Sequence, residues 1–166
     1  MAGRRPRRKG GTLKDGERRQ LARASRHGPA SLPEPAECAL VLCDGGSRGN
    51  PGTAAIAAML LAPGGDVLEQ RAALIGHASA AEAEYRAILL GLSLAALHGV
   101  EEVEVRSDSQ LAIAALRSPT PVAVEHAGLV REALEAAGEL RSVRWRWHPR
   151  TANEAADELV RGLLWP

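Results

Sequence analysis

The segment CALVLC, residues 38–43, leads directly into DGGSRGNPG, residues 44–52, and this stretch sets the expected fold. Its first part is apolar without alternation, which is typical of a central strand buried on both faces. A carboxylate at the end of such a strand lies where open α/β sheets bind their ligands. We therefore expect a buried strand at 38–43 that places Asp44 at a functional edge of a sheet.

Strand and helix patterns alternate along the rest of the chain. A Pro-Gly-Gly turn at residues 63–65 separates two apolar runs and predicts a hairpin. The expected strands are 53–61, 67–74, 103–107 and 143–148, and the expected helices are 81–98, 109–117, 122–137 and 153–164. The order βββαβααβα predicts an α/β fold, a mixed five-stranded sheet flanked by helices.

Aromatic residues are scarce, because the chain has three Trp, one Tyr and no Phe. On the strand at 143–148, Val143, Trp145 and Trp147 share one face, while Arg144, Arg146 and His148 share the other. Tryptophan can stack on nucleobases. On an apolar strand face, however, we expect Trp145 and Trp147 to belong to the core.

The composition indicates one soluble globular domain. The chain has 166 residues, of which 45% are hydrophobic and 25% are charged. A membrane-spanning helix, a collagen, a mucin and a disulfide scaffold are excluded. Cys38 and Cys43 on one strand would lie roughly 16 Å apart, too far for a disulfide. A reducing, cytoplasmic location is expected.

The net charge of +1 hides an asymmetry between two parts of the chain. Residues 1–37 carry ten Lys or Arg and four Asp or Glu, whereas residues 38–166 carry eleven and sixteen. We expect 1–37 to be a basic, disordered tail and linker, and 38–166 to be the folded domain. The tail is either a salt-dependent tether for polyanions or a solvated extension without function.

Four acidic residues stand out by their positions. Asp44 and Asp108 each follow a predicted strand, Glu84 lies on the inward face of the helix at 81–98, and Asp157 lies near the start of the last helix. Two neighbouring parallel strands would bring Asp44 and Asp108 together, and such carboxylates repel unless a cation lies between them. Any one of these acids, taken alone, is usually a helix cap or a surface charge. That explanation is much weaker for the four taken together.

Four segments together resemble the type 1 ribonucleases H, in the compact form that lacks a separate hybrid-binding domain. They are DGGSRGNPG at 44–52, AEAEYRAILLGL at 81–92, SDSQL at 107–111 and HPRTANEAADEL at 148–159. Their order and spacing match the family over about residues 38–166.

The resemblance implies a metal-dependent endoribonuclease that hydrolyses the RNA strand of RNA–DNA hybrids, leaving 5′-phosphate and 3′-hydroxyl ends. Two Mg²⁺ ions, which Mn²⁺ can replace, would activate the attacking water and stabilise the leaving oxygen. Asp44 would bridge both ions, Glu84 and Asp108 would hold the ion on the leaving-group side, and Asp157 would hold the ion that carries the water.

The resemblance also implies roles for residues near these acids. His148 or Arg150 would assist proton transfer or product release. Asn153 is expected mainly to cap the last helix. Contacts with the nucleic acid, including the ribose 2′-hydroxyl groups, are implied for four residues: Gly45, Ser47, Asn50 and Asn153.

Three departures from the family pattern leave other functions open. Ser79-Ala80-Ala81 stands where the family often has Thr-Asn-Asn, residues 118–127 contain no Lys or Arg, and residues 38–166 contain no lysine. The alternatives are a nucleic-acid-binding module with weak or no turnover, or another nuclease with the same four acids. We expect no organic cofactor and no membrane partner, and we assume a monomer.

Overall fold

The computed structural model describes residues 32–118 and 122–166. The predictions for the basic tail fall almost entirely on residues 1–31, which lie outside the described residues, and so remain predictions. The strands are β1 (Ala39–Arg48), β2 (Gly52–Leu61), β3 (Val67–Ala78), β4 (Glu102–Ser107) and β5 (Ser142–Trp147). The helices are α2 (Ala80–Leu97), α3 (Gln110–Arg117), α4 (Val124–Gly138), the 3-10 turn η1 (Arg150–Ala152) and α5 (Glu154–Leu164).

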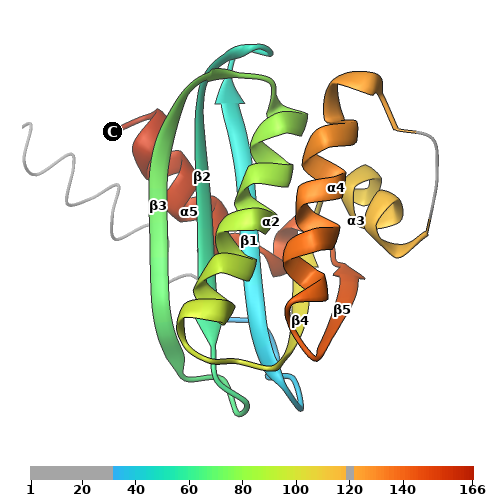
Figure 1. Ribbon diagram of the computed structural model, residues 1–166. Coiled ribbons are helices and arrows are strands. Elements are labelled where there is room, and N and C mark those ends of the chain that lie inside the picture. Colours follow the sequence, from blue (N-terminus) through green and yellow to red (C-terminus); the bar gives the residue numbers. More distant parts are fainter. Residues whose placement is uncertain (1–31, 119–121) are drawn as a thin grey trace, which may run out of the picture. The chain divides into compact units, whose positions relative to one another are not determined.

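The strands form one five-stranded mixed sheet in the order β3-β2-β1-β4-β5 (Figure 1). β1 is antiparallel to β2 and parallel to β4, and β5 continues the parallel half. Crossover helices carry the chain between the parallel strands, as the predicted order requires. The expected α/β class and strand arrangement are confirmed.

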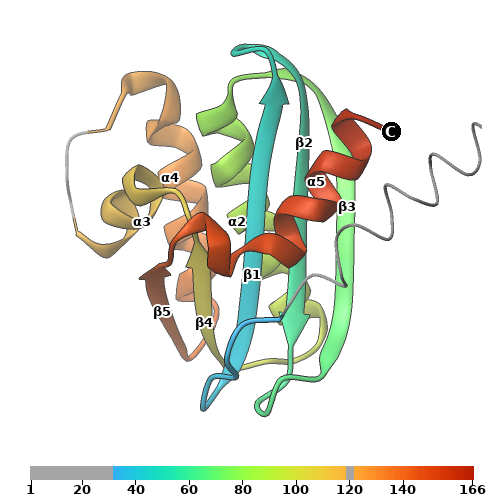
Figure 2. The same cartoon turned by 180° about the vertical axis from the view of Figure 1, so that it is seen from behind.

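Helices cover the two faces of the sheet unequally. α2 packs on β1 and β2, and α4 packs beside α2, whereas α5 crosses β1, β2 and β3 on the opposite face (Figures 1 and 2). The predicted inward face of α2 is buried, including Ala87, Ile88, Gly91 and Ala95. A Cβ atom at Gly91 would lie 2.3 Å from a methyl carbon of Val41, so glycine lets α2 approach β1 closely.

β1 is longer than predicted. The sequence suggested a strand that ends at Cys43 and a glycine-rich loop after it, but β1 runs to Arg48. Pairing with β2 continues from Asp44 opposite Ala57 to Arg48 opposite Thr53. The largely apolar and buried partner strand therefore extends the pairing through Gly45 and Gly46, and the turn begins at Gly49, whose φ is +87°.

The expectation that Trp147 belongs to the core is wrong. β5 is an edge strand, and the Trp147 side chain is 40% exposed, with Nε1 donating to the carbonyl oxygen of Asp108 at 3.1 Å. Trp145 is partly buried and packs against the main core as predicted. No helix in the described ranges combines the length and the apolar character that crossing a membrane requires.

Candidate active site

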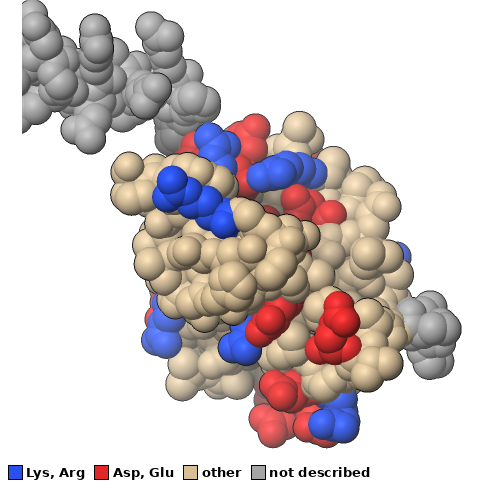
Figure 3. Space-filling view, turned by 90° about the horizontal axis from the view of Figure 1, so that it is seen from above, with Lys and Arg blue, Asp and Glu red and all other residues tan. Residues whose placement is uncertain are grey.

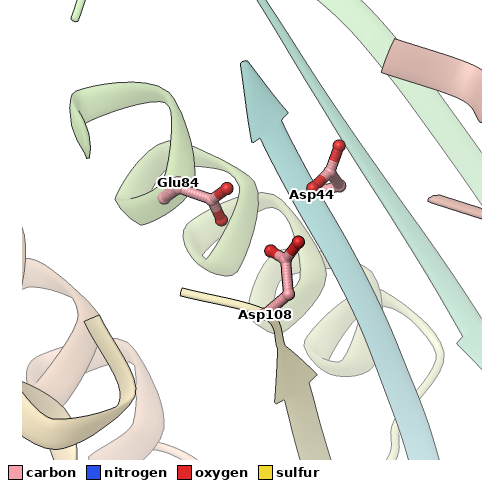
Figure 4. A group of neighbouring side chains, drawn as sticks. All are labelled: Asp44, Glu84 and Asp108. Carbon is pink, nitrogen blue, oxygen red and sulfur yellow. The ribbon is translucent and has the colours of Figure 1, made fainter. Parts of the chain in front are cut away.

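Three carboxylates from separate segments converge beside the centre of the sheet. Asp44 lies on β1, Glu84 lies on the first turns of α2, and Asp108 follows β4 (Figure 4). Each offers an oxygen atom, and these atoms all lie within 4.8 Å of one another. Residues 40 and 64 positions apart in the chain thus form one acidic cluster, as the sequence predicted for these three acids.

Strand register and one close contact produce this convergence. β1 and β4 are parallel, with Leu42 opposite Arg106, so Asp44 and Asp108 reach the same level of the sheet. A Cβ atom at Gly45 would lie 2.3 Å from the carbonyl carbon of Ala83, so only glycine allows α2 to cross here. That crossing places Glu84, the next residue of α2, against Asp44. Ser107 Oγ also donates to Glu84 Oε2 at 3.4 Å.

The cluster is electrostatically costly when it is fully ionised. Burial, with repulsion from Asp108 and Asp157, raises the pKa of Asp44 to about 7, although Arg150 acts in the opposite direction. Burial, with repulsion from Asp44 and Asp108, raises the pKa of Glu84 to about 9. Burial also raises the pKa of Asp108. Carboxylates that destabilise one another in this way favour protons or a cation between them.

Asp157 lines the same cavity but is held differently from the other three acids. Arg150 Nη2 donates to its Oδ1 at 2.7 Å, and Arg161 Nη1 donates to its Oδ2 at 3.0 Å. Both carboxylate oxygens are therefore bound by guanidinium groups. Sequence reasoning included Arg150 and missed Arg161, although its position four residues after Asp157 on a helix was a usable signal.

The carboxylates line an open cavity of about 370 Å³. The end of β1, apolar residues of α5 and the residue after that helix also line it: Gly46, Ser47, Val160, Leu164 and Trp165. The hydroxyl of Ser47 is buried and has no hydrogen-bond partner in the part of the chain that the structure describes. Trp165, which is exposed beside the cavity, was not among the predicted site residues.

His148 is a buried residue and is not among the residues that line the cavity. It is buried after β5, and its Nε2 has no hydrogen-bond partner among the described residues. Burial lowers the pKa of His148, the nearby Asn153 side chain opposes this, and Arg106 and Arg146 lower the pKa further. The structure therefore favours Arg150 over His148 as the residue of this loop that faces the cavity.

The two predicted asparagines have structural contacts. Asn153 occupies the first position before α5 but makes no side-chain capping bond, so that part of the prediction is wrong. Its Nδ2 donates instead to the carbonyl oxygen of Cys43 at 3.0 Å. Asn50 is exposed, and its Oδ1 accepts a hydrogen bond from the backbone of Ala80 at the start of α2.

Comparison with known proteins agrees with this geometry. The family model described as reverse transcriptase-like matches residues 42–162. The bifunctional protein Rv2228c of Mycobacterium tuberculosis is 35% identical over 129 residues, which is 75% of this chain and 35% of the relative. The chain spans about a third of the length of the curated relatives it matches.

Solved structures extend the comparison over most of the folded part. The ribonuclease H1 of the halophilic archaeon Halobacterium salinarum has 31% identity and a TM-score of 0.73, covering 76% of this chain and 96% of that one. The LC11 ribonuclease H1, isolated from compost by a metagenomic approach and solved in complex with an RNA/DNA hybrid, has 28% identity and a TM-score of 0.69, covering 75% and 94%. On the family match, the shared fold and the gathered acids, the chain belongs to the type 1 ribonuclease H family.

Proposed function

We propose that this chain is a metal-dependent endoribonuclease that hydrolyses the RNA strand of RNA–DNA hybrids, leaving 5′-phosphate and 3′-hydroxyl ends. The observation that carries the proposal is the cluster of Asp44, Glu84 and Asp108, with oxygen atoms within 4.8 Å of one another at an open cavity. The solved LC11 relative with a bound hybrid supports the substrate class.

The donor set fits divalent metal ions. It consists of hard carboxylate oxygens, which Mg²⁺ prefers, and the raised pKa values of Asp44 and Glu84 come partly from repulsion that a cation would remove. We propose that two Mg²⁺ ions, replaceable by Mn²⁺, are held by Asp44, Glu84 and Asp108, with Asp157 completing the set. Bound there, they would supply Lewis-acid activation of water and charge stabilisation.

Asp157 can contribute to such a site only when its oxygens become available. Both are bound to arginines, and the Arg150 side chain, being 72% exposed, can move with little cost in packing. Arg161 lies on the same helix as Asp157 and holds the other oxygen. We propose that Arg150 leaves Asp157 and donates hydrogen bonds to the phosphate, a role that suits a planar guanidinium group.

Recognition of the RNA strand is proposed for the end of β1 and the turn after it. Ser47 lines the cavity, and its buried hydroxyl has no partner among the described residues, so a rotation of the side chain would offer it to a ribose hydroxyl. Asn50 uses Oδ1 to bind the start of α2, which leaves its amide nitrogen for the substrate. Gly45 allows close approach, and its backbone helps to hold Glu84. Contacts to 2′-hydroxyls distinguish RNA from DNA.

A labelled hybrid duplex tests the proposal. The full chain would be incubated with Mg²⁺ or Mn²⁺, with the RNA strand labelled in one reaction and the DNA strand in the other. Asp44→Asn, which keeps the side-chain shape and removes the charge, is the matched control. We expect internal cuts in the RNA strand alone, absent in the variant. An intact RNA strand with both metals, or cuts that persist in Asp44→Asn, would contradict the proposal.

A second candidate is a hybrid-binding module with little turnover. It is favoured by residues 118–127, which contain no Lys or Arg to grip a nucleic-acid strand. The same assay separates the two, because such a module would shift the mobility of the hybrid without cutting it. Cuts in duplex RNA or DNA would instead indicate another nuclease with these acids. We further propose a cytoplasmic location, which suits the free thiols of Cys38 and Cys43, and we keep the assumption of a monomer.

A further inference from the structure

The back of β4 and β5 carries a group of charged side chains that the active site does not use. Glu104 and Arg106 on β4 lie opposite Arg144 and Arg146 on β5, on the face away from the apolar core formed by Val105 and its neighbours. Figure 2 shows this part of the sheet without a helix across it, because α5 packs on β1, β2 and β3 instead.

Positive charge is in excess within this group. Glu104 is the shared carboxylate of three guanidinium groups, with nitrogen–oxygen distances of 2.5 Å to Arg106, 3.6 Å to Arg146 and 3.9 Å to Arg144. Arg106 is buried and also donates to the carbonyl oxygen of Glu34 at 3.0 Å. Among Glu104, Arg106, Arg144 and Arg146, three positive charges thus face one carboxylate, and the excess lies on the exposed members, although Glu37 also acts on Arg144.

Arg144 and Arg146 are the exposed members, with 56% and 61% of their side chains accessible. Their contacts to Glu104 are long, and Arg144 additionally donates to the sulfur of Cys38 at 3.1 Å. A guanidinium group has five N–H donors, so most donors of both residues have no partner within residues 32–118 and 122–166. Other described arginines pair differently. Arg71, Arg86 and Arg131 each contact one glutamate, and Arg141 contacts two. Arg150 and Arg161 bind Asp157 beside the acidic cluster.

The group adjoins the candidate active site. Arg106 lies on β4, two residues before Asp108, which follows that strand, and Arg146 precedes Arg150 by four residues. A nucleic-acid strand held at the carboxylates would therefore find these arginines next to it, toward the back of the sheet. Figure 3 shows the domain from above, and basic side chains are interspersed with acidic ones there. The face in that view therefore offers no continuous basic surface to the phosphates.

We propose that Arg144 and Arg146 bind the phosphodiester backbone of the hybrid beside the cleaved position. The proposal rests on the proposed function for its substrate. Guanidinium forks match phosphate oxygens in geometry, and each phosphate neutralised by an arginine releases bound counterions. Residues 38–166 contain sixteen Asp or Glu against eleven Arg and no Lys, so few cations are available for the phosphates outside the tail. An acidic peptide is the competing occupant.

The salt dependence of hybrid binding tests this directly. The full chain would be compared with Arg144→Gln/Arg146→Gln and with the matched control Arg131→Gln/Arg141→Gln, whose arginines are 74% and 72% exposed elsewhere on the domain. Binding to a hybrid duplex would be measured over a range of salt concentrations with a chelator present, which prevents cleavage. We expect the slope of log K against log salt to fall by about 0.7 to 0.9 per proposed arginine, and to stay unchanged in the control.

A charge-preserving variant, a folding control and a competing peptide complete the experiment. Arg144→Lys/Arg146→Lys keeps the charge and should keep the slope. The melting temperature of Arg144→Gln/Arg146→Gln shows whether its loss of binding reflects loss of folding. Equal slopes for the unchanged protein and the Gln variant would overturn the proposal, as would a polyglutamate peptide that binds the unchanged protein more tightly than the hybrid does. If the unchanged protein fails to cut the hybrid but the slope still depends on these arginines, the nuclease proposal fails while this one stands.

Discussion

Asn153, which is fully buried at the start of α5, donates a 3.0 Å hydrogen bond from Nδ2 to the carbonyl oxygen of Cys43, the residue directly before Asp44. The bond joins segments 110 residues apart in the chain. One of these segments carries Asp44 and the other carries Asp157, so this contact sets the separation of two of the four acids.

Replacing Asn153 with Ala should lower both stability and cleavage. The change removes a buried donor and leaves the Cys43 carbonyl without it, which costs about 1–3 kcal/mol. Urea unfolding measures the stability, and the hybrid assay measures the rate. Asn50→Ala is the matched control, because that asparagine bonds the backbone at the exposed surface and should cost less than about 1 kcal/mol. Equal unfolding midpoints for Asn153→Ala and the unchanged protein would refute the structural role.

Gly45→Ala should destabilise the fold by about 3 kcal/mol or more, near the upper end of overpacking effects. The new Cβ would lie 2.3 Å from the backbone of Ala83, and backbone in a helix cannot move aside as a side chain can. Gly128→Ala on α4 is the control, because no atom lies within 4 Å of a Cβ there and alanine favours a helix by about 1 kcal/mol. Chemical denaturation of the two variants should move in opposite directions, and a shift in the same direction would contradict this account of how α2 meets β1.

The sheet and three of the acids could be predicted because short-range patterns decide them. The apolar run at 38–43 and the alternation at 103–107 identify β1 and β4, and their parallel pairing brings Asp44 and Asp108 together. Glu84 followed from helical periodicity, which places it on the face of α2 that turns inward.

The remaining features depend on tertiary partners that local patterns do not contain. From the sequence alone, the glycines at 45 and 46 predict a loop. In the structure they belong to β1, because both pair with β2. Trp147 alternates correctly for the core, yet β5 is an edge strand and no neighbouring strand covers it on that side. Asn153 lies where a helix cap is expected, but its side chain donates a hydrogen bond to the carbonyl oxygen of Cys43 on β1 instead.

The stability of the metal-free protein should fall as the pH rises. The pKa values of Asp44 and Glu84 are raised from 3.8 and 4.5 to about 7 and about 9, so the folded state binds more protons than the unfolded state between those limits. The contribution of these groups is therefore greatest at low pH and is lost through about pH 4 to 9. Because a divalent cation can replace the protons, Mg²⁺ should raise the melting temperature more at about pH 9 than at about pH 5.

Thermal unfolding at several pH values, with chelator and with Mg²⁺, measures this effect. Glu84→Gln removes the group with the larger rise and serves as the comparison, because other titrating groups are the same in both proteins. The difference between the two proteins should widen with pH in chelator. A Mg²⁺ effect that is equal at every pH would show that protons and the cation do not compete at these carboxylates.

Asp108→Asn should separate catalysis from stability and from binding. The amide keeps the side-chain shape but removes a negative charge that helps to raise the pKa values of Asp44 and Glu84, so the metal-free variant should melt at a higher temperature than the unchanged protein. Cleavage of the RNA strand should fall by more than about 100-fold, since even groups that only support metal ligands cost 10–100-fold when replaced. Binding of the hybrid should stay within a few-fold, because one fewer negative charge does not oppose the phosphates. Cleavage at the unchanged rate would remove Asp108 from the site, whereas a lower melting temperature would show that its charge is already balanced in the metal-free protein.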